Sequence, residues 1–346
     1  MIKVSVLGAT GYAGIELVRL LTGHPAVAVT RLVSKSYAGQ PLARVYPGFK
    51  NVLDITLEPL DVESAAADSD VIFTALPHGA SKEIIPLLLG KNARVIDFSG
   101  DYRYNSAEVY EKWYGQPHSS PELLKQSVYG LCELHREEIA RARLVGNPGC
   151  YTTCSILALA PLLAKKMIRA DGVIIDAKSG VTGAGRTAAL DYSFCECTEN
   201  TRAYKIAAHR HTSEIEQELS LLAGEEIVLS FTPHLIPLKR GILATCYADL
   251  TAPRTAGEVL AVFKEYYKDE YFIRVYDEGD LPETNHVAGS NFVDIGLAVD
   301  ARLNRVIVVA CLDNIIKGAA GQAVQSMNIM FGLPETTGIG NAAFYL

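Results

Sequence analysis

Short apolar runs alternate with longer amphipathic stretches along the first hundred residues. Runs with the length and β-branched content of strands lie at 2–7, 27–33, 71–76 and 94–98, and stretches with helical spacing lie at 13–23 and 79–89. Strands separated by helices of about ten residues indicate a parallel sheet, because parallel neighbours need such a crossover. We therefore expect the chain to open with an α/β Rossmann domain, built on a doubly wound parallel sheet.

The middle of the chain has a less regular pattern. Strands are expected at 173–178, 227–233, 242–250, 293–299 and 305–312, with irregular helices between them. This pattern indicates an α+β domain with a mixed or antiparallel sheet. A last amphipathic helix, expected over 314–331, directly follows the final strand and is expected to pack back on the first domain. We therefore predict one domain from 1–148 together with 314–346, and a second from 149–313.

Composition and charge narrow the class of protein. The 346 residues exceed the roughly 250–300 at which single cores stop growing, which agrees with two domains. The net charge is −7 and no basic tract is present, so a nucleic-acid partner is not expected. No apolar run reaches the about 20 residues that span a bilayer, and the chain opens directly into a strand. We therefore expect neither a membrane anchor nor a signal segment.

The seven cysteines fit no CxxC pair, and their number is odd; they stand at 132, 150, 154, 195, 197, 246 and 311. This argues against a disulfide framework and against a structural metal site. We expect the reducing cytoplasm, where a free thiol can act.

A glycine-rich turn, GATGYAG at 8–14, lies between the first strand and the first helix. A dinucleotide site needs such a turn, because the backbone must approach the pyrophosphate and the helix N-terminus offers free N–H groups. The loop 77–81 follows the third strand at the same edge of the sheet. The expected cofactor contacts are Gly8, Thr10, Gly11, Tyr12, Gly14 and Pro77. The alternative is an ordinary tight turn between a strand and a helix.

The end of the second strand indicates which cofactor binds. An NAD enzyme would place Asp or Glu there to hold the ribose 2′-hydroxyl, but this chain has Ser34, Lys35 and Ser36. Hydroxyls and a cation suit a 2′-phosphate, so NADP is predicted. The alternative is that Lys35 is a solvated loop lysine.

Cys150 stands where a turn becomes a helix, in GNPGCYTTCSI at 146–156. A thiol in this position feels the positive end of the helix dipole, which favours the thiolate. The free N–H groups there suit an oxyanion. We therefore predict that Cys150 is a nucleophile, the alternative being a buried structural cysteine. Cys154, one turn later, is expected to pack in the core.

A histidine that could serve this thiol occurs in HRHTSEIE at 209–216. Thr212 or Ser213 is expected to cap the following helix, which leaves His211 just before its start. Glu214 would orient the imidazole or complement the helix dipole. His209 is the competing acid/base.

Three glycine-rich segments beside Arg or Lys, at 97–103, 178–186 and 234–241, are candidates for anion binding. Together they suggest a substrate with two anionic groups, the alternative being solvated loop cations.

The order of GATGYAG, GNPGCYTT, KSGVTGAGR, HRHTSEIEQ, HLIPLKRG and DNIIKGAAGQAVQ resembles the type 1 N-acetyl-γ-glutamyl-phosphate reductase family, within the aspartate-semialdehyde dehydrogenase superfamily. The resemblance covers essentially the full length. The family usually has Pro where Thr152 stands, and we expect this departure, in the first helical turn, not to affect the chemistry.

The resemblance implies NADPH-dependent reductive dephosphorylation of N-acetylglutamyl 5-phosphate to the 5-semialdehyde, in arginine biosynthesis. It implies a thioester on Cys150 with His211 as acid/base, and a second domain used for catalysis and for contacts in a homodimer or homotetramer. The implied substrate contacts are Arg103, Ser179, Arg186 and His209, and the further cofactor contacts are Ser179, Gly180 and Asn314.

Two rivals remain from the sequence. One is a reductase of a carrier-protein-linked aminoadipyl or glutamyl phosphate, although the charge of −7 disfavours an acidic carrier. The other is a non-enzymatic NADP-binding regulator, which has no reason to place a cysteine at a turn-to-helix junction.

Overall fold

The computed structural model describes residues 1–90 and 93–344, and the chain separates into two compact units. The first unit comprises Met1–Pro148 and Ala319–Gly340. The second comprises Gly149–Gly318 and the segment that begins at Asn341. The chain thus returns to the first unit at Ala319 rather than at 314, and its C-terminal segment belongs to the second unit.

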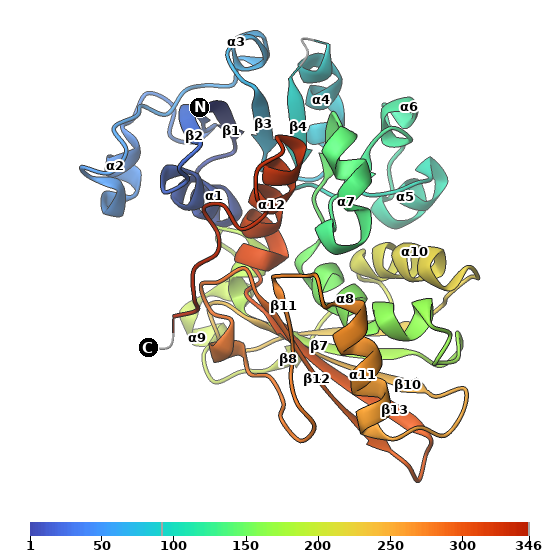
Figure 1. Cartoon of the computed structure of the whole chain (residues 1–346). Coiled ribbons are helices and arrows are strands. Elements are labelled where there is room, and N and C mark those ends of the chain that lie inside the picture. The colour runs from blue at the N-terminus through green and yellow to red at the C-terminus, as the bar shows by residue number, and fades with distance from the viewer. Residues whose placement is uncertain (91–92, 345–346) are drawn as a thin grey trace. The chain divides into compact units, whose positions relative to one another are not determined.

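The first unit is built on a parallel sheet, whose strands β1 to β4 are labelled in Figure 1. Within the described residues the strand order is β2-β1-β3-β4-β6-β5, and every neighbouring pair is parallel. The strands are β1 (Ile2–Leu7), β2 (Val27–Val33), β3 (Val71–Thr74), β4 (Arg94–Asp97), β5 (Val128–Tyr129) and β6 (Leu144–Gly146). The predicted Rossmann class is confirmed.

The helices of the first unit are α1 (Tyr12–Thr22), α2 (Leu42–Val45), η1 (Pro47–Phe49), α3 (Val62–Ala67), α4 (Ser81–Leu89), α5 (Ala107–Tyr114), α6 (Pro121–Leu124), α7 (Cys132–Arg141) and α12 (Gly321–Met330). Of these, α1, α4, α7 and α12 pack on strands of the sheet. Helix α12 contacts α1, α7 and β4, and Gln322 Nε2 donates to the Gly130 carbonyl at 2.7 Å. No helix in the described part of the chain has both the length and the apolar character needed to cross a bilayer.

The helix expected over 314–331 is interrupted. A π-helix, η5 (Ile316–Ala320), precedes α12. The Asp313 carboxylate accepts from the N–H groups of Ile315 and Ile316 at 2.9 and 3.1 Å, and the Asp313 carbonyl accepts from the Gly318 N–H. These bonds impose the wider turn, because a bond from residue 318 to residue 313 skips one residue more than an α-helical bond.

The second unit contains a mixed sheet, of which β10, β12 and β13 are labelled in Figure 1. Among the described residues the order is β11-β12-β13-β10-β7-β9-β8. The strands are β7 (Ile174–Ser179), β8 (Arg202–Ala203), β9 (Ser230–Leu235), β10 (Ile242–Asp249), β11 (Ile273–Val275), β12 (Val293–Asp300) and β13 (Arg305–Leu312). The pairs β7–β9 and β11–β12 are parallel and the others are antiparallel, as the α+β prediction allowed.

Helix α8 forms the core of the second unit. It packs on β10 and β13 and contacts α10 and α11, and every residue from Tyr151 to Leu163 is buried. The helices of this unit are α8 (Cys150–Ala164), η2 (Val181–Ala184), η3 (Leu190–Tyr192), α9 (Phe194–Cys197), α10 (His211–Ala223), α11 (Ala256–Tyr266) and η4 (Thr284–His286). The position of Cys150 is therefore set by a helix that the core holds on all sides.

Candidate active site

Cys150 is the first residue of α8, directly after the N-cap residue Gly149. Its side chain is half-buried. Burial raises the pKa of the Cys154 thiol well above its ordinary value and that of Cys246 to about 12, and it raises the pKa of Cys311 as well. These three thiols are kept neutral in the core, whereas Cys150 lies at the positive end of a long helix.

Two glycines leave room for Cys150 and for the neighbouring histidine. A Cβ at Gly149 would lie 2.3 Å from His211 Nε2, and a Cβ at Gly318 would lie 2.7 Å from Cys150 Cβ. Both distances are far shorter than a van der Waals contact. The imidazole of His211 therefore packs against the residue that precedes Cys150, and only glycine permits this approach.

Glu214, in the first turn of α10, contacts the start of α8 with its carboxylate. Its buried Oε1 accepts from the Gly149 N–H at 2.9 Å and lies 2.9 Å from Thr152 Oγ1. Thr152 Oγ1 is also 2.6 Å from the Gly149 carbonyl oxygen. The carboxylate thus complements the dipole of α8, and Thr152 contacts a candidate catalytic side chain. We expected the departure at Thr152 not to affect the chemistry, but this contact ties it to the candidate site.

The predicted cap of α10 is wrong. The helix begins at His211, its N-cap is Arg210 without a side-chain cap bond, and Ser213 Oγ donates to the Arg210 carbonyl at 3.0 Å. Thr212 and Ser213 lie in the first turn because this bond folds Ser213 back onto the helix start. His211 is therefore the first helical residue rather than the residue before the helix.

His209 is buried in an aromatic cluster. Its ring centroid lies 5.8 Å from that of Tyr151, 5.5 Å from that of Tyr204 and 5.5 Å from that of Phe231. Burial, assisted by nearby positive charge, lowers the pKa of His209 to about 4, so the ring is neutral near pH 7. Its Nδ1 accepts from the backbone N–H of His211 at 3.1 Å. This environment suits a residue that supports His211 better than it suits the acid/base itself.

Tyr151 and Tyr204 join this cluster, and the sequence did not single them out. The Tyr204 hydroxyl donates to that of Tyr151 at 3.4 Å, and burial raises the pKa of both phenols. The one available signal was the aromatic residue directly after the cysteine in GNPGCY. Nothing near Tyr204 in the sequence indicates this contact, which tertiary packing creates.

Two of the three glycine-rich segments lie together in the second unit. The Gly180 N–H donates to the Gly241 carbonyl at 2.9 Å, and Ser179, at the end of β7, is buried. Asn314 joins the segments, because its Oδ1 accepts from the Gly241 N–H at 2.8 Å and its Nδ2 donates to Thr182 Oγ1 at 3.1 Å. The predicted positions Ser179, Gly180 and Asn314 are thus brought together.

The cations of these segments differ in their surroundings. Lys178 pairs with Asp176 at 2.8 Å, and Arg186 is exposed. Arg103 belongs to the first unit, where it is buried and its Nη2 donates to the Phe98 carbonyl at 2.7 Å. Of the two arginines predicted to hold substrate anions, Arg186 is therefore the more open.

The glycine-rich turn of the first unit packs closely on itself and on the loop after β3. Gly8 has φ +89°, and a Cβ there would lie 2.3 Å from the Ala75 carbonyl oxygen in the loop after β3. A Cβ at Gly14 would lie 2.3 Å from the Gly8 carbonyl oxygen. Gly11 is the N-cap of α1, with Tyr12 as the first helical residue, and Pro77 is exposed in the loop after β3. The turn therefore needs its glycines for the close passage of backbone segments.

Ser34 is less available than predicted. It is buried, and its hydroxyl lies 2.8 Å from that of Thr10, whose carbonyl accepts from the Tyr46 hydroxyl. Lys35 and Ser36 are exposed. The polar groups open to a ligand after β2 are therefore those of Lys35 and Ser36, while Ser34 holds the turn.

Known proteins match the whole chain. Family models described as the NAD binding domain and the dimerisation domain of semialdehyde dehydrogenase match residues 3–142 and 150–314. A protein named N-acetyl-γ-glutamyl-phosphate reductase from Acetivibrio thermocellus is 59% identical over 346 residues, covering 100% of both chains. The chain belongs to the N-acetyl-γ-glutamyl-phosphate reductase family. A second relative of that name, from Caldicellulosiruptor saccharolyticus, is 53% identical and covers 98% of each chain.

Solved structures share the fold of this reductase family member at low identity. Aspartate semialdehyde dehydrogenase II from Vibrio cholerae has a TM-score of 0.74 at 18% identity, covering 96% of this chain and 99% of that chain. Aspartate semialdehyde dehydrogenase with NADP from Candida albicans has a TM-score of 0.71 at 19% identity, covering 96% and 98%. At such identity these matches show the fold alone.

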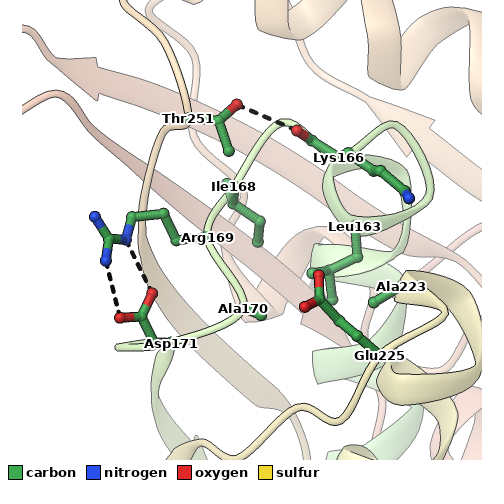
Figure 2. Close-up of a pocket in the computed structure, with 9 residues that line it drawn as sticks. All are labelled: Leu163, Lys166, Ile168, Arg169, Ala170, Asp171, Ala223, Glu225 and Thr251. Atoms are coloured by element: carbon green, nitrogen blue, oxygen red, sulfur yellow. Dashed lines mark hydrogen bonds and ion pairs between the residues drawn. The ribbon is translucent and has the colours of Figure 1, made fainter.

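The second unit has a hollow of about 440 Å³ (Figure 2). Leu163, near the end of α8, lines this hollow. The rise along the helix places Leu163 about 20 Å from Cys150, at the other end of α8. Arg169 and Asp171 on its wall face one another in a two-pronged ion pair, with N–O distances of 2.9 and 3.0 Å. We assign it no part in the chemistry of this reductase family member.

Acidification is expected to destabilise the fold through His209. The ordinary imidazole pKa of 6.5 applies to the unfolded chain and about 4 to the folded one, so between these values the unfolded state binds more protons. This contribution is complete above pH 6.5 and is lost as the pH falls to about 4, by up to roughly 3 kcal/mol at about 1.4 kcal/mol for each pH unit.

The test compares wild type with His209→Asn in denaturant titrations from pH 7 to pH 4. The free energy of unfolding should fall less steeply in the variant. Parallel declines would contradict the prediction, because the other histidines with lowered pKa values, His24 and His118, are present in both proteins.

Proposed function

We propose that this chain reduces N-acetyl-γ-glutamyl phosphate to N-acetylglutamate 5-semialdehyde and phosphate, through a thioester on Cys150 and with NADPH as reductant. The observation that carries the proposal is the helix start at which Cys150 stands, with His211 packed against Gly149. The substrate follows from the names of relatives at 59% and 53% identity over nearly the whole chain.

The first step is attack of the Cys150 sulfur on the acyl carbon. The sulfur–carbon bond forms, the carbon–oxygen bond to phosphate breaks, and phosphate leaves with the bonding electron pair. His211 accepts the thiol proton and returns a proton to the leaving phosphate. The start of α8 favours the thiolate, and its first N–H groups suit the developing oxyanion.

The second step releases the aldehyde. NADPH, when bound, supplies the hydride that the thioester carbon accepts. The carbon–sulfur bond then breaks and sulfur leaves as thiolate. His211, which has taken up a proton from solvent after the first step, donates it and restores the Cys150 thiol. We propose that Glu214 is a positioning residue. Its carboxylate accepts a hydrogen bond from the Gly149 N–H and so fixes the turn against which the His211 ring packs.

The cofactor proposal is supported by the turn after β1. Gly8 and Gly14 allow a close backbone approach, and Gly11, Thr10, Tyr12 and the N-terminus of α1 would hold the pyrophosphate. The exposed cation of Lys35 and the neighbouring Ser36 suit the 2′-phosphate of NADP. Ser34 instead hydrogen-bonds to the Thr10 hydroxyl. The further cofactor contacts Pro77, Ser179, Gly180 and Asn314 remain proposals.

The substrate contacts and the assembly are proposals of the same kind. We assign four residues to the substrate: Arg186, Ser179, His209 and Arg103. Of the two arginines, Arg186 is the more exposed. The dimerisation domain supports a homodimer or a homotetramer. A reducing compartment such as the cytoplasm suits a mechanism that needs a free thiol.

Cys150→Ser is expected to lower kcat/KM by more than about 1,000-fold, because a serine hydroxyl is a far poorer nucleophile than a thiolate. The measurement is phosphate-dependent reduction of NADP with N-acetylglutamate 5-semialdehyde. Cys195→Ser, at an exposed thiol, is the matched control and should keep wild-type activity. Full activity of Cys150→Ser would end the thioester proposal. No turnover by wild type would favour a carrier-linked substrate or a regulator.

Gly149→Ala is expected to lower kcat by roughly 10- to 100-fold, because the new methyl would displace the His211 imidazole. The backbone at Gly149, with φ −70° and ψ 150°, accepts alanine without strain, so the contact alone is tested. The pH profile of kcat should shift with the histidine. Gly257→Ala, where a Cβ meets nothing closer than 3.5 Å, is the control, and equal kcat in both variants would contradict the proposed role of His211.

Lys35→Glu is expected to raise KM for NADPH at least about 10-fold with little change in KM for NADH, because a carboxylate repels the 2′-phosphate. Lys50→Glu, at another exposed lysine of the first unit, changes the net charge equally and should leave both values as in wild type. If wild type uses NADH as well as NADPH, the cofactor assignment is wrong.

A further inference from the structure

The glycine-rich segment 97–103 was a candidate for anion binding, but it contains two buried carboxylates. Asp97 and Asp101, both in the first unit, have no exposed surface. Burial of a carboxylate is costly unless hydrogen bonds replace its hydration. The groups that donate to these two side chains therefore show what the segment does.

The Asp101 carboxylate holds residues 77–80, which lie between β3 and α4 and which we call the 77–80 loop. Its two oxygens accept from the Gly79 N–H at 2.9 and 2.8 Å, and one of them accepts from the Lys82 N–H at 3.2 Å. The Tyr110 hydroxyl, from α5, donates to it at 3.0 Å. The N-cap residue of α4 makes no side-chain cap bond. Asp101 thus supplies, from a distant part of the chain, an acceptor for the free N–H groups at the start of α4.

The position of Asp101 is itself fixed by the ends of two strands. Thr74 Oγ1, at the end of β3, donates at 2.7 Å to Asp97, which is the last residue of β4. Ser99 Oγ donates to Asp97 at 2.5 Å and accepts from the Asp101 N–H at 3.1 Å. Buried hydrogen bonds therefore connect the carboxyl ends of β3 and β4 to the 77–80 loop.

The 77–80 loop lies at the edge of the sheet that dinucleotides use in this fold. It follows β3, which pairs with β1, and ligands of doubly wound sheets bind at the carboxyl ends of such strands. The glycine-rich turn is its neighbour, because a Cβ at Gly8 would lie 2.3 Å from the Ala75 carbonyl oxygen. Pro77 and His78 are exposed. The loop thus offers its exposed residues next to the proposed pyrophosphate site.

We propose that Asp101 is a positioning residue for the dinucleotide, which fixes the 77–80 loop in the conformation that receives the cofactor. Its carboxylate acts through Gly79 and Lys82 and does not touch the cofactor. A loop that is already ordered loses less conformational freedom on binding, so the affinity for the cofactor rises. The assignment rests on the proposed function, since it takes NADPH as the ligand of the first unit.

The test is the Kd of NADPH for Asp101→Asn, measured by fluorescence titration of the full chain. Asparagine offers an NH₂ donor in place of one acceptor oxygen, so it leaves one of the groups held by Asp101 without an acceptor. The Kd should rise at least about 10-fold, while kcat at saturating NADPH should stay within about 2-fold of wild type. Loss of a negative charge alone favours an anionic cofactor, so a rise in Kd reports the loop rather than the charge.

Asp70→Asn is the matched control. Asp70 is exposed directly before β3, at the opposite end of that strand, and its Oδ2 accepts from the Lys3 N–H at 2.8 Å. The asparagine oxygen can keep this bond, so Kd and kcat should remain as in wild type. An unchanged Kd in Asp101→Asn would overturn the proposal. A fall in kcat with an unchanged Kd would also overturn it, because that pattern indicates general damage to the fold.

A second measurement uses wild type alone and decides the matter if Asp101→Asn does not fold. Hydrogen–deuterium exchange is followed without added NADPH. The amides of Gly79 and Lys82 should exchange at least about 10-fold more slowly than in an unfolded peptide of the same sequence, because both donate to a buried carboxylate. Exchange as fast as in the peptide would overturn the proposal.

Binding and turnover by wild type separate this proposal from the proposed function. A wild type that binds NADPH more tightly than Asp101→Asn but has no reductase activity would refute the proposed function and keep the role of Asp101. A wild type that is active, with the same Kd as Asp101→Asn, would refute the role of Asp101 alone. A wild type that does not bind NADPH would refute both.

Discussion

The approach of α10 to the first turn of α8 is the contact on which the candidate site depends. Gly149 lacks a side chain, so the His211 imidazole lies directly against its Cα, and the Gly149 N–H is held by Glu214 from the same helix. One turn of α10 thus supplies both the proposed proton carrier and the group that fixes the loop beneath it. Thr152 adds a hydroxyl to this contact from the α8 side. A movement of one helix relative to the other would change the distances from the thiol to the imidazole and the carboxylate, so the packing of α10 on α8 fixes their relative positions.

The burial of α8 explains why that contact is rigid. Helix α8 has apolar residues on all sides and packs against strands and against other helices. Close packing on every face restricts its movement relative to the core. Its first and last residues, Cys150 and Ala164, are half-buried, and Cys150 stands at the positive end of the helix. The same core keeps the thiols of Cys154, Cys246 and Cys311 neutral, so these three cysteines do not compete with Cys150 as nucleophiles.

Periodicity was enough to predict β1 to β4 of the first unit and the longer strands of the mixed sheet, because those elements follow from local alternation. It did not indicate the short strands β5, β6, β8 and β11, which have two or three residues each. The junction at Cys150 was also predictable, since Asn-Pro-Gly before an apolar helix is a local signal. The contacts of Glu214, Thr152 and Gly318 were not, because they join residues far apart in the chain. The predicted cap at Thr212 or Ser213 failed for a local reason, as the Ser213 hydroxyl bonds back to the Arg210 carbonyl. Ser34 was identified from its place at the end of the second strand, but it is buried and its hydroxyl hydrogen-bonds to that of Thr10.

The two glycines beside Cys150 and His211 also say where this scaffold can change. A larger side chain at 149 or 318 would collide with His211 or Cys150, so these two positions tolerate only glycine. The stretch around Arg186 has no packed interior to disturb, and substitutions there cost no core stability in the single chain. Altered acyl preference, whether through natural divergence or directed evolution, should therefore accumulate in that stretch while the start of α8 stays constant.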